Sequence, residues 1–477
     1  MNSTPRSVCI HGHFYQPPRE SPWTGVIERQ VSAAPFHNWN ARIAAECYAP
    51  CLAAPILDAD GAVLRRVNCW SHLSFDVGPT LMRWLNLHAK DVHDGIVAAD
   101  RARVAERGFG GAMAQGYHHA ILPLCSDEDR KTEIHWGLVD FEARFGRRAE
   151  GLWMPESAVS QATLCDLVDA GVQFVVLAPE QAEAIEGPQG WSNNLTGADC
   201  ARAHRVELPG GRSMAAFFYD GPASRGVAFD GWLHNGERMG RQLSQGEGGL
   251  TNLATDGESY GHHHRHGEMA LAYAIQTLDE LDVPLTVYAE WLAAHPPQAR
   301  ARVVENSSWS CSHGVGRWCR NCGCAMDGAH VGKHAWRQVV RDALNGLRDR
   351  IDTWCLPRLA EVGGDDPWAL RNAYIHHVLA TEGLVGPGAA AFAGDAAAPV
   401  RALLEVQRHR LMMFTSCGWF FDDPYGLETT QILRYAQRAI ELVVEAGGPD
   451  FTGDFQSELT ALPELEIHRA GGTGSSA

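Results

Sequence analysis

The sequence lacks three features that would place it among membrane or nucleic-acid-binding proteins. No apolar run approaches the length needed to span a bilayer. Residues 1–5 are polar, and no apolar stretch of signal-peptide length follows them. Positive charge is scarce, because 40 Lys and Arg stand against 57 Asp and Glu, for a formal net charge of −17. We therefore expect a cytoplasmic protein with no nucleic-acid partner and no membrane partner.

The cysteines do not form the even, regularly spaced pattern of a disulfide framework. There are 13 of them, and many, such as Cys9, Cys165 and Cys355, lie in apolar surroundings. In a chain without a signal segment, most are expected to be reduced thiols of the core. Tryptophan is plentiful, with 15 residues. Its ring suits both an apolar core and the stacking of sugar faces.

Short apolar runs alternate with helical periodicity over the first 300 residues or so. The alternation predicts strands at residues 7–11, 66–70, 111–115, 150–154, 173–177, 214–218, 250–255 and 285–287. Helices are predicted at residues 80–87, 127–145, 157–170 and 266–281. Repeated alternation of strand and helix indicates parallel strands joined by crossover helices. The expected fold is α/β, an irregular TIM-like barrel of seven or eight (β/α) units, with a doubly wound open sheet as the alternative.

The strand pattern fades after about residue 330. Four helices are predicted there, at residues 334–356, 367–381, 399–414 and 427–445. The chain is long enough for one large barrel with an appended helical region. We expect a catalytic barrel over residues 1–300, a Cys/His-rich connecting loop over residues 301–330 and a helical C-terminal domain over residues 331–470.

Reactive side chains follow several predicted strands directly. They are His11 and His13 after the first strand, His118 and His119 after the third, Glu156 after the fourth, and Asp256 and Glu258 after the seventh. In a parallel barrel the carboxyl ends of all strands open on one face, where active sites are assembled. The sequence therefore predicts that these residues meet in one site.

Two carboxylates stand out in this set. Glu156 follows Trp153 at the end of an apolar strand, so it could be a nucleophile or a residue that favours the positive end of the helix dipole. Asp256 could be a general acid or part of a tight Asp-Gly turn. A retaining glycosidase needs two carboxyl groups about 5–5.5 Å apart on opposite sides of the scissile bond.

Five short strings resemble the motifs of glycoside hydrolase family 57. They are HGHFYQPP, GYHHAILP, GLWMPES, TDGESYG and, in part, WSCSHGVGRW. The resemblance implies a retaining mechanism on α-glucans, with Glu156 as nucleophile and Asp256 as general acid/base. The later segment resembles a helical domain of an uncharacterised branch of this family. The fifth string departs from the family pattern, because the acidic residue expected shortly before His313 is absent and Trp309 and Ser310 lie there instead.

The resemblance also implies a set of sugar-binding residues. They are His11, His13, His118, His119, Trp153, Glu258, His263, Trp309 and His313. Neutral imidazoles both donate and accept hydrogen bonds, which suits vicinal hydroxyls. Some family members have a glutamate where this chain has His119. The expected partner is an α-glucan substrate, and the sequence leaves the linkage, the chain length and the oligomeric state open.

A further cluster of sulfur and imidazole ligands lies between residues 311 and 324. It contains Cys311, His313, Cys319, Cys322 and Cys324. The Cys319-x-x-Cys322 pair has the spacing of a zinc knuckle, but no second such pair follows. We expect no cofactor and no metal, so that the cluster forms a local disulfide or holds reduced thiols. The alternative is a zinc site at Cys311, Cys319, Cys322 and Cys324.

Three functions remain open at this point. The first is a retaining α-glucan hydrolase or glucanotransferase. The second is a metal-dependent hydrolase of the amidohydrolase or deacetylase type, since His11-x-His13 lies where such barrels place two metal ligands. The third is a non-catalytic carbohydrate-binding relative that keeps the barrel.

Overall fold

The structure is a computed structural model that describes residues 6–245, 248–326, 328, 333–384, 386 and 388–459. The chain forms two compact units. The first comprises Met1–Pro18, Glu28–Gly314 and Leu379–Leu384. The second comprises Arg19–Ile27, Val315–Val378 and Val385–Ala477.

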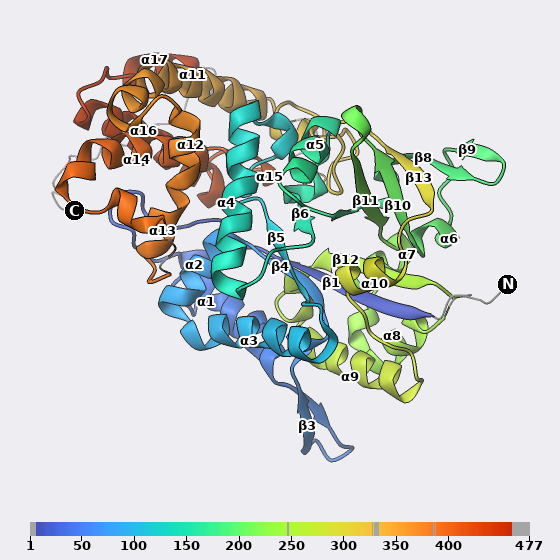
Figure 1. The fold of residues 1–477 in the computed structure, drawn as a ribbon. Coiled ribbons are helices and arrows are strands. Elements are labelled where there is room, and N and C mark those ends of the chain that lie inside the picture. The colour runs from blue at the N-terminus through green and yellow to red at the C-terminus, as the bar shows by residue number, and fades with distance from the viewer. Residues whose placement is uncertain are drawn as a thin grey trace. The chain divides into compact units, whose positions relative to one another are not determined.

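A curled sheet of parallel strands lies at the centre of the first unit (Figure 1). Its order is β12 (Leu250–Asp256), β1 (Ser7–Phe14), β4 (Ser74–Val77), β5 (Ala112–Gln115) and β6 (Leu152–Trp153), with every pair parallel. A parallel bridge from Gly151 to Phe174 leads on to β7 (Phe174–Leu177), which pairs in parallel with β11 (Ser213–Phe218). The predicted α/β class, with parallel strands followed by a helical region, is confirmed.

Further strands extend this architecture. Beyond β11 the second sheet continues with β10 (Ala203–Glu207), β13 (Ala299–Val303), β8 (Ala182–Gly187) and β9 (Gly190–Ser192). The β10–β11, β13–β8 and β8–β9 pairs are antiparallel. These four strands were not predicted, and β13 joins β10 and β8 from a distant part of the sequence.

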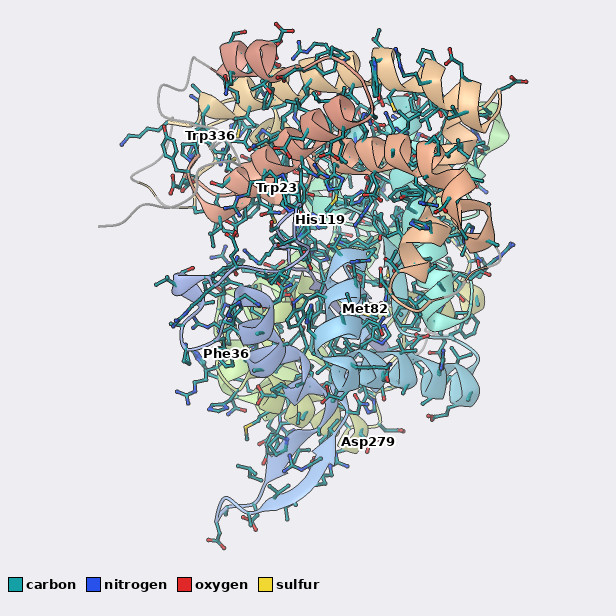
Figure 2. The ribbon with its side chains drawn as sticks, turned by 90° about the vertical axis from the view of Figure 1, so that its left-hand side faces the viewer. Trp23, Phe36, Met82, His119, Asp279 and Trp336 are labelled. Atoms are coloured by element: carbon teal, nitrogen blue, oxygen red, sulfur yellow. The ribbon has the colours of Figure 1, made fainter. Side chains whose placement is uncertain are left out.

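The helices of the first unit flank the sheet, and Met82 on α2 and Asp279 on α9 mark two of them in Figure 2. They are α1 (Trp39–Ile43), α2 (Pro79–His88), α3 (Lys90–Arg107), α4 (Asp127–Phe145), α5 (Gln161–Asp169), α6 (Gly197–Cys200), α7 (Gly221–Ala228), α8 (Gly236–Leu243), α9 (Gly267–Glu280) and α10 (Tyr288–Ala294). Apolar side chains from β1, β5, β6, β7, β11, β12 and α10 pack together in the core. The parallel strands are thereby held on a rigid base.

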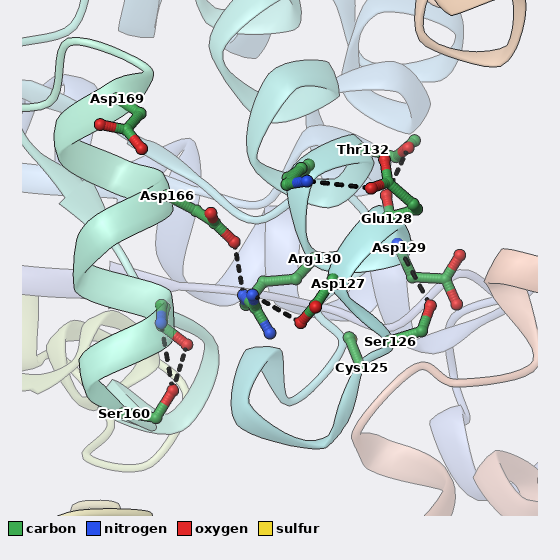
Figure 3. Close-up of polar contacts among 12 residues, drawn as sticks. Cys125, Ser126, Asp127, Glu128, Asp129, Arg130, Thr132, Ser160, Asp166 and Asp169 are labelled. Carbon is green, nitrogen blue, oxygen red and sulfur yellow. Dashed lines mark hydrogen bonds and ion pairs between the residues drawn. The ribbon is translucent and has the colours of Figure 1, made fainter. Parts of the chain in front are cut away.

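Local capping explains why α4 and α5 begin where they do. The Ser126 hydroxyl accepts a hydrogen bond from the Asp129 N–H, and acidic residues fill the first turn of α4 (Figure 3). Arg130 joins α4 to Asp166 of α5 through a 2.6 Å hydrogen bond. The Ser160 hydroxyl caps α5. The helix that was predicted to begin at residue 157 therefore begins at Gln161, four residues later, and Glu156 lies outside it.

The predicted strand over residues 66–70 is wrong. Val63–Val67 forms β3, which pairs antiparallel with β2 (Ala54–Leu57) in a hairpin that projects from the sheet (Figure 1). The Val63 and Leu64 side chains are exposed, so β3 belongs to a two-stranded ribbon and not to the core. The sheet strand is β4, a few residues further on. The predicted strand over residues 285–287 is reduced to a single parallel bridge between Val8 and Leu285.

The second unit is helical. Its helices are α11 (Trp336–Gly363), α12 (Pro367–Ala373), α14 (Ala398–Met412), α15 (Cys417–Phe420), α16 (Leu427–Glu445) and α17 (Thr452–Leu459), and α13 (Ile375–Ala380) runs from this unit into the first. On α14, Arg410 pairs with Asp352 of α11, and Gln407 donates a 2.9 Å hydrogen bond to the same carboxylate. All four predicted helical segments are confirmed, the second as the pair α12 and α13. In the part of the chain that the structure describes, no helix is both long and apolar enough to cross a membrane.

Candidate active site

Three side chains lie side by side at the carboxyl ends of adjacent strands. His13 on β1 is in register with Asp76 on β4 and with Asp256 on β12. Residues in register on parallel strands project from the same face of the sheet. The structure thus brings together His13 and Asp256, as predicted from the sequence. It adds Asp76, which sequence reasoning missed because the second strand had been placed too early.

Asp76 is a buried carboxylate that binds two imidazoles. Its Oδ1 lies 3.1 Å from His11 Nε2, and its Oδ2 lies 2.8 Å from His13 Nδ1. His11 Nδ1 also lies 3.0 Å from the Ser74 hydroxyl. All of these residues are buried. One carboxylate therefore fixes the orientation of both histidines of the first motif.

The two imidazoles carry different charges. Burial lowers the pKa of His11 in spite of its contact with Asp76, so this ring is neutral. Burial also opposes the charge of His13, but the Asp76 carboxylate, helped by Asp256 and Glu258, raises the pKa of His13 to about 9. His13 is therefore an imidazolium at neutral pH. It places a positive charge among the carboxylates of the site.

His119 accepts a hydrogen bond from this imidazolium. Its Nε2 lies 3.3 Å from His13 Nε2, and its ring stacks on Tyr15 with centroids 3.7 Å apart. Burial and the nearby His13 charge hold the pKa of His119 well below its usual value, so its ring is neutral and can accept. His118 turns the other way, with its Nδ1 2.8 Å from Glu133 on α4.

Two tryptophans enclose the histidines. Trp153 is fully buried and stacks on His11 and His13, with ring centroids 4.8 Å and 5.0 Å apart. Trp309 is half-buried and meets Trp153 edge to face at 4.9 Å. Trp153 thus forms the floor beneath the imidazoles, and Trp309 is the more accessible of the two rings.

Glu156 occupies a strained turn immediately after β6. It lies in the turn Pro155–Ser157, with φ of 59°, and Ser157 follows with φ of 47°. Left-handed backbone at a non-glycine residue costs energy and is frequent at functional sites. The Glu156 carbonyl accepts a 3.1 Å hydrogen bond from the Trp309 N–H. The helix-terminus interpretation of this glutamate is excluded, because α5 begins only after Ser160.

One oxygen of the Glu156 carboxylate accepts two hydrogen bonds. Trp309 Nε1 donates to Oε2 at 3.1 Å, and the Ser310 hydroxyl donates to the same oxygen at 2.6 Å. Burial raises the pKa of Glu156, while the Ser310 hydrogen bond, the His13 charge and the Trp309 hydrogen bond oppose this rise. The negative charge of Asp256 raises it further. Asp256 itself is exposed. The two predicted catalytic carboxylates are thus close enough to act on each other electrostatically.

Glu258 is the third carboxyl group of the site. Its Oε1 accepts hydrogen bonds from the Tyr48 hydroxyl at 2.5 Å and from the Tyr15 N–H at 3.1 Å. Burial, with a contribution from the Asp256 charge, raises the pKa of Glu258 to about 7, although the Tyr48 hydrogen bond lowers it. The His263 N–H donates to the Glu258 carbonyl, and the His263 side chain is exposed.

The residues that sequence reasoning missed differ in the signal that could have revealed them. Tyr15 lies within the first motif and Ser310 within the fifth, so inspection of those strings could have found them. Tyr48 contacts Glu258 from a distant part of the chain, in a segment with no motif. Asp76 would have been found if Ser74–Val77 had been recognised as a strand.

His313 lies with cysteines. In the described ranges, one group of potential metal ligands was found, formed by Cys311, His313, Cys322 and Cys324, whose ligand atoms all lie within 4.8 Å of one another. Cys319 is not part of this group. Its Sγ lies 3.6 Å from the Val315 carbonyl oxygen.

Comparison with protein families finds two matches along the chain. Residues 80–304 match the model of glycosyl hydrolase family 57. Residues 333–472 match a domain of unknown function, DUF3536. A search of curated proteins finds no match.

Several solved structures have a similar fold at low sequence identity. An exo-type maltose-forming amylase from Pyrococcus sp. ST04 is 16% identical, with a TM-score of 0.71 over 96% of this chain and 84% of that one. A branching enzyme from Pyrococcus horikoshii is 15% identical, with a TM-score of 0.57 over 98% and 96%. The α-amylase AmyC from Thermotoga maritima is 13% identical, with a TM-score of 0.58 over 98% of each chain. At these identities the likeness establishes the fold alone.

Proposed function

Because residues 80–304 form a glycosyl hydrolase family 57 domain, followed by DUF3536, we propose that the protein is a retaining hydrolase or glucanotransferase of α-glucans. Glu156 attacks the anomeric carbon and forms a covalent glycosyl-enzyme. Asp256 protonates the leaving oxygen, and then removes a proton from the water or sugar hydroxyl that resolves the intermediate. The parallel strands β12, β1, β4, β5, β6, β7 and β11 then correspond to a distorted (β/α)7 barrel whose carboxyl ends carry the site.

The arrangement around Glu156 is the observation that supports this proposal most directly. Trp309 and Ser310 both donate to Oε2, and the strained backbone fixes the direction of the side chain. Because Oε2 is held in this way, Oε1 is the oxygen that would form the bond with the anomeric carbon. The His13 imidazolium favours the ionised carboxylate, the form that a nucleophile needs.

Asp256 suits the role of proton donor for a different reason. It stands at the exposed end of β12, beside His13 and near Glu156. A bound glucan would displace water from this carboxyl group. The carboxyl group would then lie against the glycosidic oxygen that must be protonated.

The other predicted sugar contacts divide into two layers in this proposal. His13, His119 and Glu258 bind sugar hydroxyls, and Trp309 stacks on a sugar face. His11 and Trp153 are fully buried and His118 is turned toward Glu133, so these three support the first layer. His263 and His313 are exposed and could contact only outer sugars.

The proposal is tested by following maltooligosaccharide products. Proton NMR recorded in the first minutes should detect the α-anomer before mutarotation, because a double displacement retains configuration. Hydrolysis would raise the number of reducing ends, whereas glucanotransfer would redistribute chain lengths at constant reducing ends. Early β-anomer would overturn the retaining mechanism, and no change in any maltooligosaccharide or glycogen would overturn the assignment to α-glucans.

Replacement of Ser310 with alanine should change the pH profile. The Ser310 hydroxyl donates to the ionised Glu156 and lowers its pKa, so its removal should raise that pKa further. Because the ionised form is the active one, the acidic limb of kcat/KM should move to higher pH. Ser310→Thr, which keeps the hydroxyl, should restore the limb. A limb that does not move in Ser310→Ala would show that this hydrogen bond does not control the nucleophile.

A further inference from the structure

Four potential ligands converge in the segment that follows Trp309 and Ser310. The thiols of Cys311, Cys322 and Cys324 and the imidazole of His313 all offer ligand atoms within 4.8 Å of one another. All four belong to the single stretch Cys311–Cys324, so their convergence is a local property of this segment. Ligands of a tetrahedral zinc ion lie about 3.8 Å apart, given Zn–S bonds of about 2.3 Å. A small inward adjustment would bring the group to this spacing.

The chemistry of the four ligands selects the metal. Three sulfurs and one imidazole match the Cys₃His set of structural zinc sites. Carboxylates are missing from the group, so it does not suit calcium or magnesium, which prefer oxygen. Four protein ligands complete a tetrahedron, which is typical of a structural site and not of a catalytic one.

The backbone around the cysteines supports a thiolate cluster. The Cys324 N–H lies 3.5 Å from Cys322 Sγ, so a main-chain donor already points at one sulfur. Such donors stabilise metal thiolates and orient them. Gly323 between the two cysteines has φ of 88°, a left-handed conformation that suits glycine, and the sulfurs on either side of it lie within 4.8 Å of each other. Arg337 Nη1 donates a 2.8 Å hydrogen bond to the Cys324 carbonyl.

We propose that Cys311, His313, Cys322 and Cys324 bind one structural zinc ion. This ligand set differs from the one that spacing suggested, because His313 replaces Cys319. The Cys319 thiol instead points at the Val315 and Gly316 carbonyls of its own turn. It is therefore a matched control within the same segment.

The site would also fix the donors of Glu156. Cys311 directly follows Ser310, whose hydroxyl lies 2.6 Å from the Glu156 carboxylate. A zinc ion on Cys311 and His313 would limit the motion of Trp309 and Ser310. This consequence rests on the proposed function of Glu156, whereas zinc binding itself does not.

Metal analysis of the full chain, purified without chelators, tests the proposal. Wild type and Cys319→Ser should each hold about one zinc per chain, and a Cys322→Ser/Cys324→Ser double variant should lose about tenfold or more. Cobalt-substituted wild type should show thiolate charge-transfer and tetrahedral d–d bands. The zinc content and the cobalt spectrum of the wild-type chain test the proposal even if the double variant does not fold.

Four outcomes would overturn the zinc site. They are wild type with neither zinc nor a cobalt spectrum, iron in place of zinc, equal loss of zinc in Cys319→Ser, and a disulfide within the segment detected by thiol counting under denaturing conditions. Zinc bound as expected in a protein that turns over no glucan would uphold the metal site and count only against the proposed function.

Discussion

Glu156→Gln is expected to lower kcat/KM for maltooligosaccharides about a thousandfold or more, since loss of a nucleophile removes the covalent path. The amide keeps the shape of the side chain. It can also keep an acceptor for Trp309 and Ser310, so the turn Pro155–Ser157 should persist. Thermal unfolding close to that of wild type would confirm that the loss is chemical and not structural.

Asp256→Asn provides the matched control for this result. It too should lose most activity on maltooligosaccharides, by about a hundredfold to ten-thousandfold, because the leaving oxygen is no longer protonated. An α-glucosyl fluoride needs no such proton, since fluoride leaves unaided. Asp256→Asn should therefore still form the glycosyl-enzyme from the fluoride, and added azide should speed turnover by resolving it without a general base.

The two variants should then respond in opposite ways. Glu156→Gln should remain inactive on the fluoride as well, because the attacking oxygen is missing. If Glu156→Gln turned over either substrate at the wild-type rate, its role as nucleophile would be wrong. If azide and fluoride rescued neither variant, Asp256 would not be the acid/base.

The sequence predicted elements well where local signals determine them. Helix α4 was predicted at its observed bounds, because Ser126 caps it, acidic residues fill its first turn and Gly146 adopts the left-handed conformation at its end. The short strand β4 was missed because the prediction placed a strand over residues 66–70, which overlap the run Val63–Val67 just before it. That run forms a ribbon with β2, and no local signal distinguishes a ribbon from a sheet strand.

The candidate site shows the same division between local and distant information. The motifs placed His13 and Asp256 at the ends of their strands, and the register β12–β1 then sets them opposite each other. The contacts of Trp309 and Ser310 with Glu156 join residues more than 150 positions apart, which no spacing rule predicts. The charge states of His11 and His13 could not be predicted from the sequence either, because their opposite pKa shifts depend on burial and on the contact with Asp76.

Asp76→Asn is expected to lower kcat/KM about a hundredfold, through loss of positioning and not of a reacting group. The carboxylate holds His11 through Oδ1 and His13 through Oδ2, and an amide offers an acceptor to only one of them. The other imidazole would face an N–H₂ group and turn away. A displacement of about 1 Å in a positioned group can cost this much activity.

The pH profile separates a positioning role from a merely structural one. In wild type the Asp76 charge raises the pKa of His13 to about 9, so the imidazolium is present below that pH and is lost as the pH rises through it. If activity needs this charge, the alkaline limb of kcat/KM should lie near pH 9. In Asp76→Asn that charge no longer opposes the effect of burial on His13, so the pKa of His13 falls. The alkaline limb should therefore move to lower pH.

Asp100→Asn is a suitable control for this experiment. Asp100 is as buried as Asp76 and pairs with Arg147 at 3.0 Å, but it has no contact with the histidines among the described residues. Its replacement should lower the melting temperature and leave the alkaline limb in place. A limb that moved equally in both variants would reflect general loosening of the fold. A limb unchanged in Asp76→Asn would mean that the charge of His13 plays no part in turnover, because the carboxylate that sustains it would be gone without consequence.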